Sequence, residues 1–114
     1  MATTFNTTID QGADWYLTVT WNDPSGNPIN LTGYSAALQI RTSPLAKTTV
    51  LSLTSGSGIT LGGTAGTIAI HATNAQTGSI TNGTYAYDLE LTSAGGIVSR
   101  LINGTIQVTP QVTR

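Results

Sequence analysis

Cysteine is absent from this chain of 114 residues, and charge is scarce. Without cysteine there is no disulfide framework, no thiolate nucleophile and no sulfur-ligated zinc. Charged residues make up 8% of the sequence, and the four basic and five acidic side chains almost cancel, whereas an average soluble domain has about 25%. Such a chain produces no electrostatic field that attracts nucleic acid or anionic lipid, so we expect neither as a partner.

Histidine is nearly absent as well, because His71 is the only one. A catalytic triad would need His71 to meet a serine and an acid across the fold, and no Gly-x-Ser-x-Gly motif supports this. We expect His71 to be a surface residue at a strand end. Metal-binding clusters and nucleotide-binding motifs are also lacking, so we expect no enzyme, no cofactor and no small-molecule substrate.

Long apolar runs are missing too. No run approaches the length of a membrane span, and the N-terminus Met1-Ala2-Thr3-Thr4 lacks the basic and apolar regions of a signal peptide. We therefore expect no membrane partner and synthesis in the cytoplasm. The length suits one hydrophobic core, which predicts a single domain over residues 1–114.

Alternation of apolar and polar residues is the strongest positive signal, and it is clearest in the stretch 82–92. A period of two places one set of side chains on each face of an extended chain, whereas a helix would scatter both sets. The apolar face holds Tyr85, Tyr87, Leu89 and Leu91, and the opposite face holds Ala86, Asp88 and Glu90. This stretch predicts a core strand.

A glycine turn follows this strand at 93–96, and a second long extended run covers 97–109. Together they predict a β-hairpin. A three-residue loop with Gly96 in a left-handed bulge pairs Ser93 with Ile97.

That register brings charged residues together across the hairpin. Counting back along both arms places Glu90 opposite Arg100 and Leu89 opposite Leu101, which predicts a cross-strand ion pair between Glu90 and Arg100. Asp88 and Glu90 lie on one face about 7 Å apart, as a pair of catalytic carboxylates would. We interpret them as the solvated or interface-facing side of the hairpin.

Two more acidic residues, Asp10 and Asp14, flank a glycine loop. They lack the dense ladder of acidic and amide residues and the final glutamate of a calcium loop, which favours a turn and capping role. Thr73 and Gln76 have the spacing of a capping box, which predicts a short helical turn near residues 73–80.

Further alternating stretches lie between turns at 4–9, 15–21, 34–41, 49–53, 59–61 and 67–71. About seven to nine short strands at this spacing predict an all-β, immunoglobulin-like β-sandwich of antiparallel strands. The predicted inward residues are Trp15, Leu17, Val19, Trp21, Leu38, Ile40, Leu51, Leu53, Ile68, Ile70, Tyr87, Leu89, Leu91, Ile106 and Val108.

Several motifs resemble small structural proteins of tailed bacteriophages. They are the run Asn27-Pro28-Ile29-Asn30-Leu31-Thr32-Gly33-Tyr34, the strand end Leu38-Gln39-Ile40-Arg41, the strand from Gly83 to Leu91 and the closing run from Gly104 to Arg114. The Pro-x-Asn/Asp-Leu-Thr-Gly piece is similar to the N-terminal domain of phage baseplate upper proteins, with Asn30 in place of the usual acid.

The resemblance implies a virion protein that docks on other virion proteins and on copies of itself. It places the chain in the virion after synthesis in the bacterial host cytoplasm. We expect interaction arms at 1–9 and 109–114, since termini fray unless a partner holds them. The expected interface residues are Phe5, Thr7, Ile9, Val112 and Arg114.

Three placements remain open. The baseplate-like motif favours a tail, baseplate or fibre-attachment adaptor, and the short single-domain length favours a capsid decoration protein. A host-surface carbohydrate-binding module is the alternative of another class, and it requires an exposed aromatic ring at Tyr16, Tyr34 or a tryptophan. Trp15 and Trp21 lie on the inward phase of their strand, which favours packing over ligand binding for both.

Overall fold

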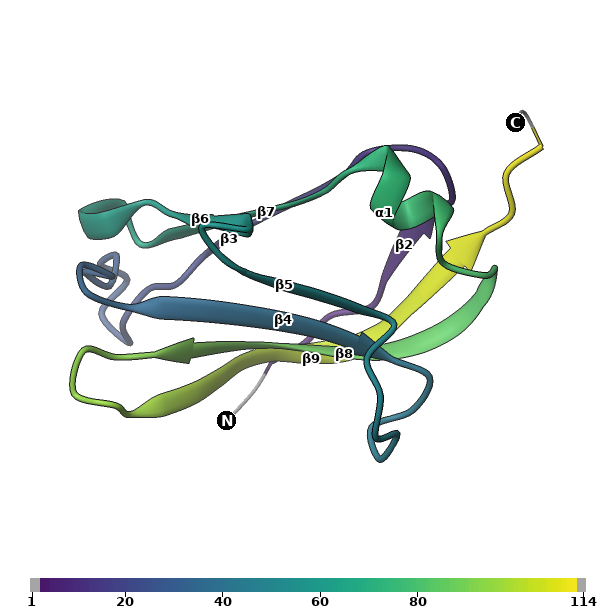
Figure 1. Ribbon diagram of the computed structural model, residues 1–114. Helices are drawn as coiled ribbons and strands as arrows, with labels where there is room; N and C mark the ends of the chain where they lie inside the picture. Colours follow the sequence, from purple (N-terminus) through teal and green to yellow (C-terminus); the bar gives the residue numbers. More distant parts are fainter. Residues whose placement is uncertain (1–2, 113–114) are drawn as a thin grey trace.

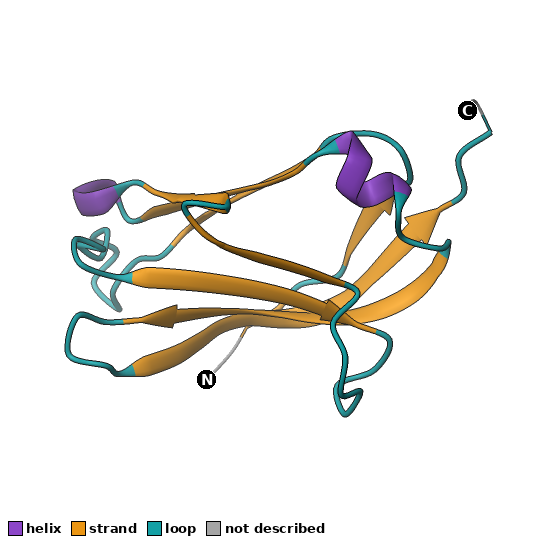
Figure 2. Ribbon diagram, in the orientation of Figure 1, coloured by secondary structure: helices purple, strands orange, loops and turns teal. Residues whose placement is uncertain are grey.

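The computed structural model describes residues 3–112 and shows one continuous sheet folded over on itself into two layers (Figures 1 and 2). Strands β3, β6 and β7 form the upper layer in Figure 1, β4, β8 and β9 form the lower layer, and β5 passes between them. The strands are β1 (Thr3–Thr4), β2 (Thr7–Asp10), β3 (Trp15–Thr20), β4 (Ser35–Arg41), β5 (Leu51–Ser55), β6 (Gly58–Leu61), β7 (Thr67–Ala72), β8 (Gly83–Thr92) and β9 (Val98–Thr109).

The predicted all-β, immunoglobulin-like sandwich is confirmed, but the sheet is mixed where we predicted antiparallel strands throughout. The sheet order is β1-β9-β8-β4-β5-β6-β7-β3, and β2 also pairs with β9. Both N-terminal strands run parallel to β9, and β5 runs parallel to β6 over two residue pairs. Whether two strands pair in parallel depends on how the chain crosses between the layers. Alternation within a single strand does not specify this crossing.

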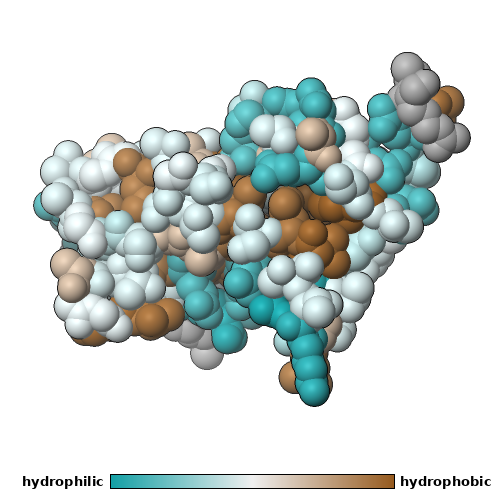
Figure 3. Space-filling view, viewed as in Figure 1, coloured by the Kyte–Doolittle hydropathy of each residue, from teal (hydrophilic) through white to brown (hydrophobic). Residues whose placement is uncertain are grey.

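The core is built from the inward faces of both layers. β8 lies between β4 and β9, and Leu89 is opposite Leu38 on one side and Ile102 on the other. Four predicted core residues are only half-buried, namely Leu17 and Val19 on β3, Trp21 directly after β3 and Leu51 on β5. The buried apolar residues outside the predicted set are Ile9, Leu31, Ala36, Ile59, Ala72, Ile80 and Ile102. Viewed from the β5 side, apolar surface gathers beneath α1 and is surrounded by neutral or hydrophilic residues (Figure 3).

The β8–β9 hairpin has the predicted turn. The Ser93 amide donates to the Ile97 carbonyl over 2.8 Å, and Gly96 has a φ of 90°. Glu90 lies opposite Arg100 as predicted. The predicted pairing of Leu89 with Leu101 is wrong, because a β-bulge between Leu89 and Glu90 leaves Leu101 without an opposite residue and places Leu89 against Ile102.

A short helix, α1 (Asn74–Gly78), closes one end of the sandwich, as Figure 1 shows. The predicted capping box is present, because the Thr73 hydroxyl accepts from the Gln76 amide and the Gln76 side chain accepts from the Thr73 amide. Thr77 is fully buried, and its hydroxyl donates to the Ala13 carbonyl over 2.8 Å. A 3-10 turn, η1 (Gly63–Ala65), was not predicted.

The described part of the N-terminal arm is integrated into the sheet along β9. The Tyr87 hydroxyl donates to the Phe5 carbonyl over 2.5 Å, and burial raises the pKa of Tyr87 to about 12. Between β1 and β2 the arm crosses Gly104, where a Cβ would lie 2.8 Å from the Phe5 carbonyl carbon and closer still to its oxygen. Glycine is therefore required at 104 by the close approach of the arm.

This crossing yields a stability prediction for Gly104→Ala. The added methyl group would push the Phe5 carbonyl away from Tyr87, and we expect a loss of about 1–3 kcal/mol in the free energy of unfolding. Urea denaturation measures the effect. Gly95→Ala is the matched control, since its Cβ would meet nothing closer than 3.9 Å, and its stability should stay within about 0.5 kcal/mol of the parent. Equal stability of both variants would contradict the tight crossing.

Candidate interaction surfaces

The free edge of β3 is the first candidate surface. Within residues 3–112, β3 pairs with β7 on one side and ends the sheet on the other. The Trp21 amide donates to Gly66 across from β7, and antiparallel pairing alternates, so Tyr16, Thr18 and Thr20 direct their main-chain groups to the free side. The edge thus presents three amide donors and three carbonyl acceptors.

An apolar groove of about 490 Å³ runs beside this edge, between β3 and the paired strands β1 and β9 of the other layer. Leu17, Val19 and Trp21 point inward but are only half-buried, because no further strand covers them. The groove holds no charged residue; its lining residues are Thr3, Phe5, Leu17, Thr18, Val19, Thr20, Trp21, Asn22, Leu101 and Ile102.

The opposite end of the sheet is a poorer template for another strand. β1 and β2 are two and four residues long and are separated by Phe5 and Asn6, where the arm crosses Gly104. β3 has six consecutive residues with neither proline, glycine nor charge. Short, broken strands and charged side chains are the usual protection of an edge, so the unprotected edge of this sheet is β3.

A polar trough on the outer face of β4, β8 and β9 is the second candidate surface. Its volume is about 810 Å³. Small residues form its floor, and the N-terminal arm and the β4–β5 loop contribute to its walls. Four of the nine charged residues of the chain line it, namely Arg41, Asp88, Glu90 and Arg100. Nearly half of the charged residues of the chain therefore lie on one concave face.

The predicted ion pair between Glu90 and Arg100 is wrong, because Arg100 pairs with Asp88 instead. Arg100 Nε lies 3.4 Å from Asp88 Oδ2, whereas Glu90, although directly opposite Arg100, makes no ion pair or hydrogen bond through its carboxylate among residues 3–112. A long side chain can reach the diagonal neighbour on the adjacent strand as easily as the residue opposite. Both groups are partly exposed, so this pair adds little stability.

The wall formed by the β4–β5 loop is held by Arg41. Its guanidinium donates to the Ala46 carbonyl and to Gln39 Oε1, each over 2.8 Å. Figure 1 shows this loop projecting from the body of the sandwich, and Leu45 within it is 93% exposed. Gln39 lies beside Asp88 because β4 pairs with β8, a pairing that alternation within either strand does not predict.

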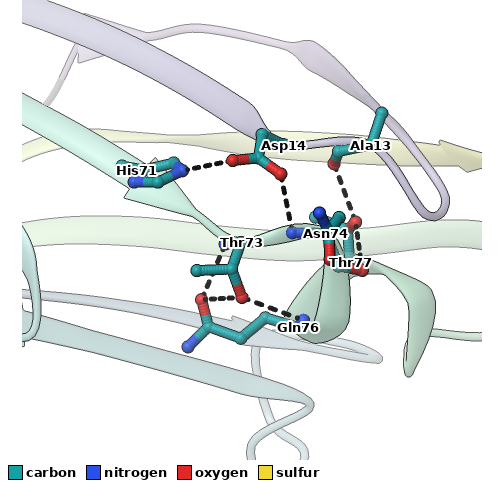
Figure 4. A network of polar contacts seen from close by, with 7 residues as sticks. All are labelled: Ala13, Asp14, His71, Thr73, Asn74, Gln76 and Thr77. Atoms are coloured by element: carbon teal, nitrogen blue, oxygen red, sulfur yellow. Dashed lines mark hydrogen bonds and ion pairs between the residues drawn. The ribbon is translucent and has the colours of Figure 1, made fainter.

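The third cluster surrounds Asp14 at the start of β3 (Figure 4). His71 Nε2 lies 2.9 Å from Asp14 Oδ2, and the Asn74 amide donates to Asp14 Oδ1 over 2.9 Å. Tyr16 stacks on the His71 ring at a centroid distance of 4.4 Å. Among the described residues no group of three acidic, histidine or cysteine side chains could hold a metal ion. Asp14 has the predicted turn and capping role, since it ties β3 to β7 and α1.

The baseplate-like motif is a structural turn. Asn30 Oδ1 accepts from both the Thr32 amide, over 3.0 Å, and the Thr32 hydroxyl, over 2.6 Å, an arrangement that an aspartate could also make. Leu31 is buried in the core, and Gly33 has a φ of 83°. Tyr34 packs edge-on against Trp21. These residues are explained by folding and need no ligand.

The predicted arm residues differ in accessibility. Phe5 is 42% exposed, Val112 is 89% exposed and Thr7 is half-buried in β2. Arg114 lies outside the described residues. The prediction of an interface side chain at Ile9 is wrong, because Ile9 is fully buried in the core of its own chain. Thr7 and Ile9 lie on the same face of β2, and this face is directed inward.

Comparisons with known proteins add little to these surfaces. No protein-family model and no curated protein matches the sequence. Among solved structures, extracellular domains 3–5 of Drosophila OTK align with a TM-score of 0.42 and 17% identity, covering 93% of this chain and 33% of that chain. The chain thus spans about a third of that structure. No helix among residues 3–112 is long and apolar enough to cross a bilayer.

The Asp14 cluster yields a pH prediction. The hydrogen bond from His71 and that from the Asn74 amide hold the pKa of Asp14 below its ordinary value of 3.8. Because the folded pKa is lowered, the contribution to stability is present above the ordinary pKa and is lost as pH falls through the folded value. We expect His71→Phe, which keeps an aromatic ring for Tyr16, to raise the Asp14 pKa towards 3.8 in an NMR titration of the carboxyl carbon. An unchanged Asp14 pKa in this variant would contradict the assignment.

Proposed function

We propose that this chain is a non-enzymatic structural module of a tailed-phage virion that docks on neighbouring virion proteins at the tail, baseplate or fibre-attachment region. The observation that carries the proposal is the free, uncharged edge of β3 beside an apolar groove. The resemblance of the sequence motifs to phage structural proteins supplies the virion context.

An open edge of this kind suits a protein that works in an assembly. Free amide and carbonyl groups on an edge strand pair readily with another extended chain, and monomeric proteins normally block them. Here neither lysine nor proline nor a bulge interrupts Trp15–Thr20. A partner that covers β3 would also bury the half-exposed side chains of Leu17 and Val19.

The low charge supports the same proposal. A surface with 8% charged residues gives weak protection against association in dilute solution, but it allows flat packing between neighbours in a shell or tube. Four of the nine charged residues line the trough, and none lines the groove beside β3.

The test is quantitative mass spectrometry of particles purified from a strain that produces this chain. We expect the chain to copurify with intact particles at a copy number far below that of the major capsid protein, and to be lost from tailless heads. A copy number matching the capsid lattice would instead favour a decoration protein. Absence from washed particles would overturn the virion proposal.

A second candidate, a carbohydrate-binding module, is favoured by one observation. Tyr16 is 68% exposed, which meets the requirement for an accessible aromatic ring, although one face of the ring is stacked on His71. In this case a glycan array should give a signal that Tyr16→Ala abolishes and Tyr34→Phe retains. A silent array would remove this candidate.

A further inference from the structure

The exposed edge strand and the residue that follows it have a nearly symmetric sequence. Residues 15–21 read Trp-Tyr-Leu-Thr-Val-Thr-Trp, with Thr18 at the centre. Trp15 mirrors Trp21, and Leu17 mirrors Val19. A strand with this symmetry matches itself when it is laid antiparallel to a second copy, because inward residues then meet inward residues of the same kind.

The main-chain groups fit the same arrangement. Tyr16, Thr18 and Thr20 direct their amides and carbonyls to the free side. With the symmetry axis at Thr18, Thr18 would face Thr18 of the second copy as a hydrogen-bonded pair, and Tyr16 would face Thr20. A register shifted by one residue would place the inward side chains of one copy against the outward side chains of the other. The direction of the free groups and the side-chain pattern therefore exclude a shift of one residue, and the mirrored sequence of residues 15–21, which overlap fully only about Thr18, selects the axis at Thr18.

The absence of charge along this edge also favours a second copy of the chain as the partner. Neither β3 nor any residue lining the adjacent groove carries a charge. A charged peptide would find no complement here, whereas two copies of this edge can approach without repulsion. The half-exposed side chains of Leu17, Val19 and Trp21 would gain neighbours of their own kind.

We propose that β3 is a self-recognition edge, through which two copies of this chain pair antiparallel about a two-fold axis at Thr18 and extend the upper layer of one sandwich into that of the other. This inference rests on the proposed function as an assembly module and names its partner. Pairing would bring the inward side chains of the two β3 strands side by side. Each copy would then cover part of the apolar surface that is left exposed in the other.

The first experiment measures the mass of the purified chain by light scattering across a concentration series. We expect a concentration-dependent shift from the 11.8 kDa protomer towards twice that mass. Thr18→Lys and Thr18→Glu should each weaken self-association at least tenfold, because like charges would meet at the axis. An equimolar mixture of the two variants should recover the dimer, since lysine would then face glutamate.

Thr60→Lys is the matched control. Thr60 is an exposed threonine on β6, which is paired on both sides within the sheet, and this change should leave the dimer intact. Circular dichroism melts of all variants establish that each is folded. A parent chain that stays monomeric throughout the series, or folded Thr18→Lys and Thr18→Glu variants that dimerise like the parent, would overturn the inference.

A second experiment fixes the register. The chain has no cysteine, and hydrogen-bonded antiparallel partners have Cα atoms about 5.5 Å apart, within the range that a disulfide spans. Thr18→Cys should therefore form a covalent dimer under mild oxidation, whereas Thr60→Cys should not. Equal crosslinking of both variants would overturn the register. These measurements use purified protein alone, so they can fail or succeed independently of whether the chain is found in particles.

Discussion

Hydrogen bonding between main chains organises this protein, because the sheet is continuous and every later feature depends on where its pairing stops. β8 is paired on both sides over most of its ten residues, and the alternation of its side chains fixes which residues of β4 and β9 face the core. The same pairing brings Gln39 and Arg41 from β4 beside Asp88 and creates the trough. Where pairing ends, at β3, the main chain and the inward side chains are both left partly uncovered.

The two surfaces have opposite chemical character. The trough collects charge on a concave face of small residues, and the β3 edge is neutral with an apolar groove beside it. A module with one surface of each kind can hold two different neighbours, since a charged partner suits the first surface and a neutral strand suits the second. The trough and the groove share no lining residue, so a second copy paired at β3 would leave the trough accessible.

Local features of the fold were predictable from the sequence, and those that depend on which strands are neighbours were not. Period-two alternation identified β3, β4 and β8, and the glycine at 96 identified the hairpin turn with its left-handed residue. The capping box identified α1, because both of its hydrogen bonds lie within four residues. The bulge beside Glu90 redirected the register, and the guanidinium of Arg100 chose the diagonal Asp88, neither of which alternation encodes. Burial of Ile9 was missed because it requires the parallel pairing of β2 with β9.

The crossing of the N-terminal arm over Gly104 also bears on how the chain folds. Asn6 Oδ1 accepts from the Thr105 amide across a separation of 99 residues, so the first strands have no partner until almost all of the described chain has been synthesised. Contacts between such distant segments close a large loop and slow folding. Until β9 is available, β2, which carries Ile9, has no strand to pair with, and the β9-facing edge of β8 stays unpaired. We therefore expect the sheet to close late in folding. The chain should be most prone to aggregation just before β9 docks.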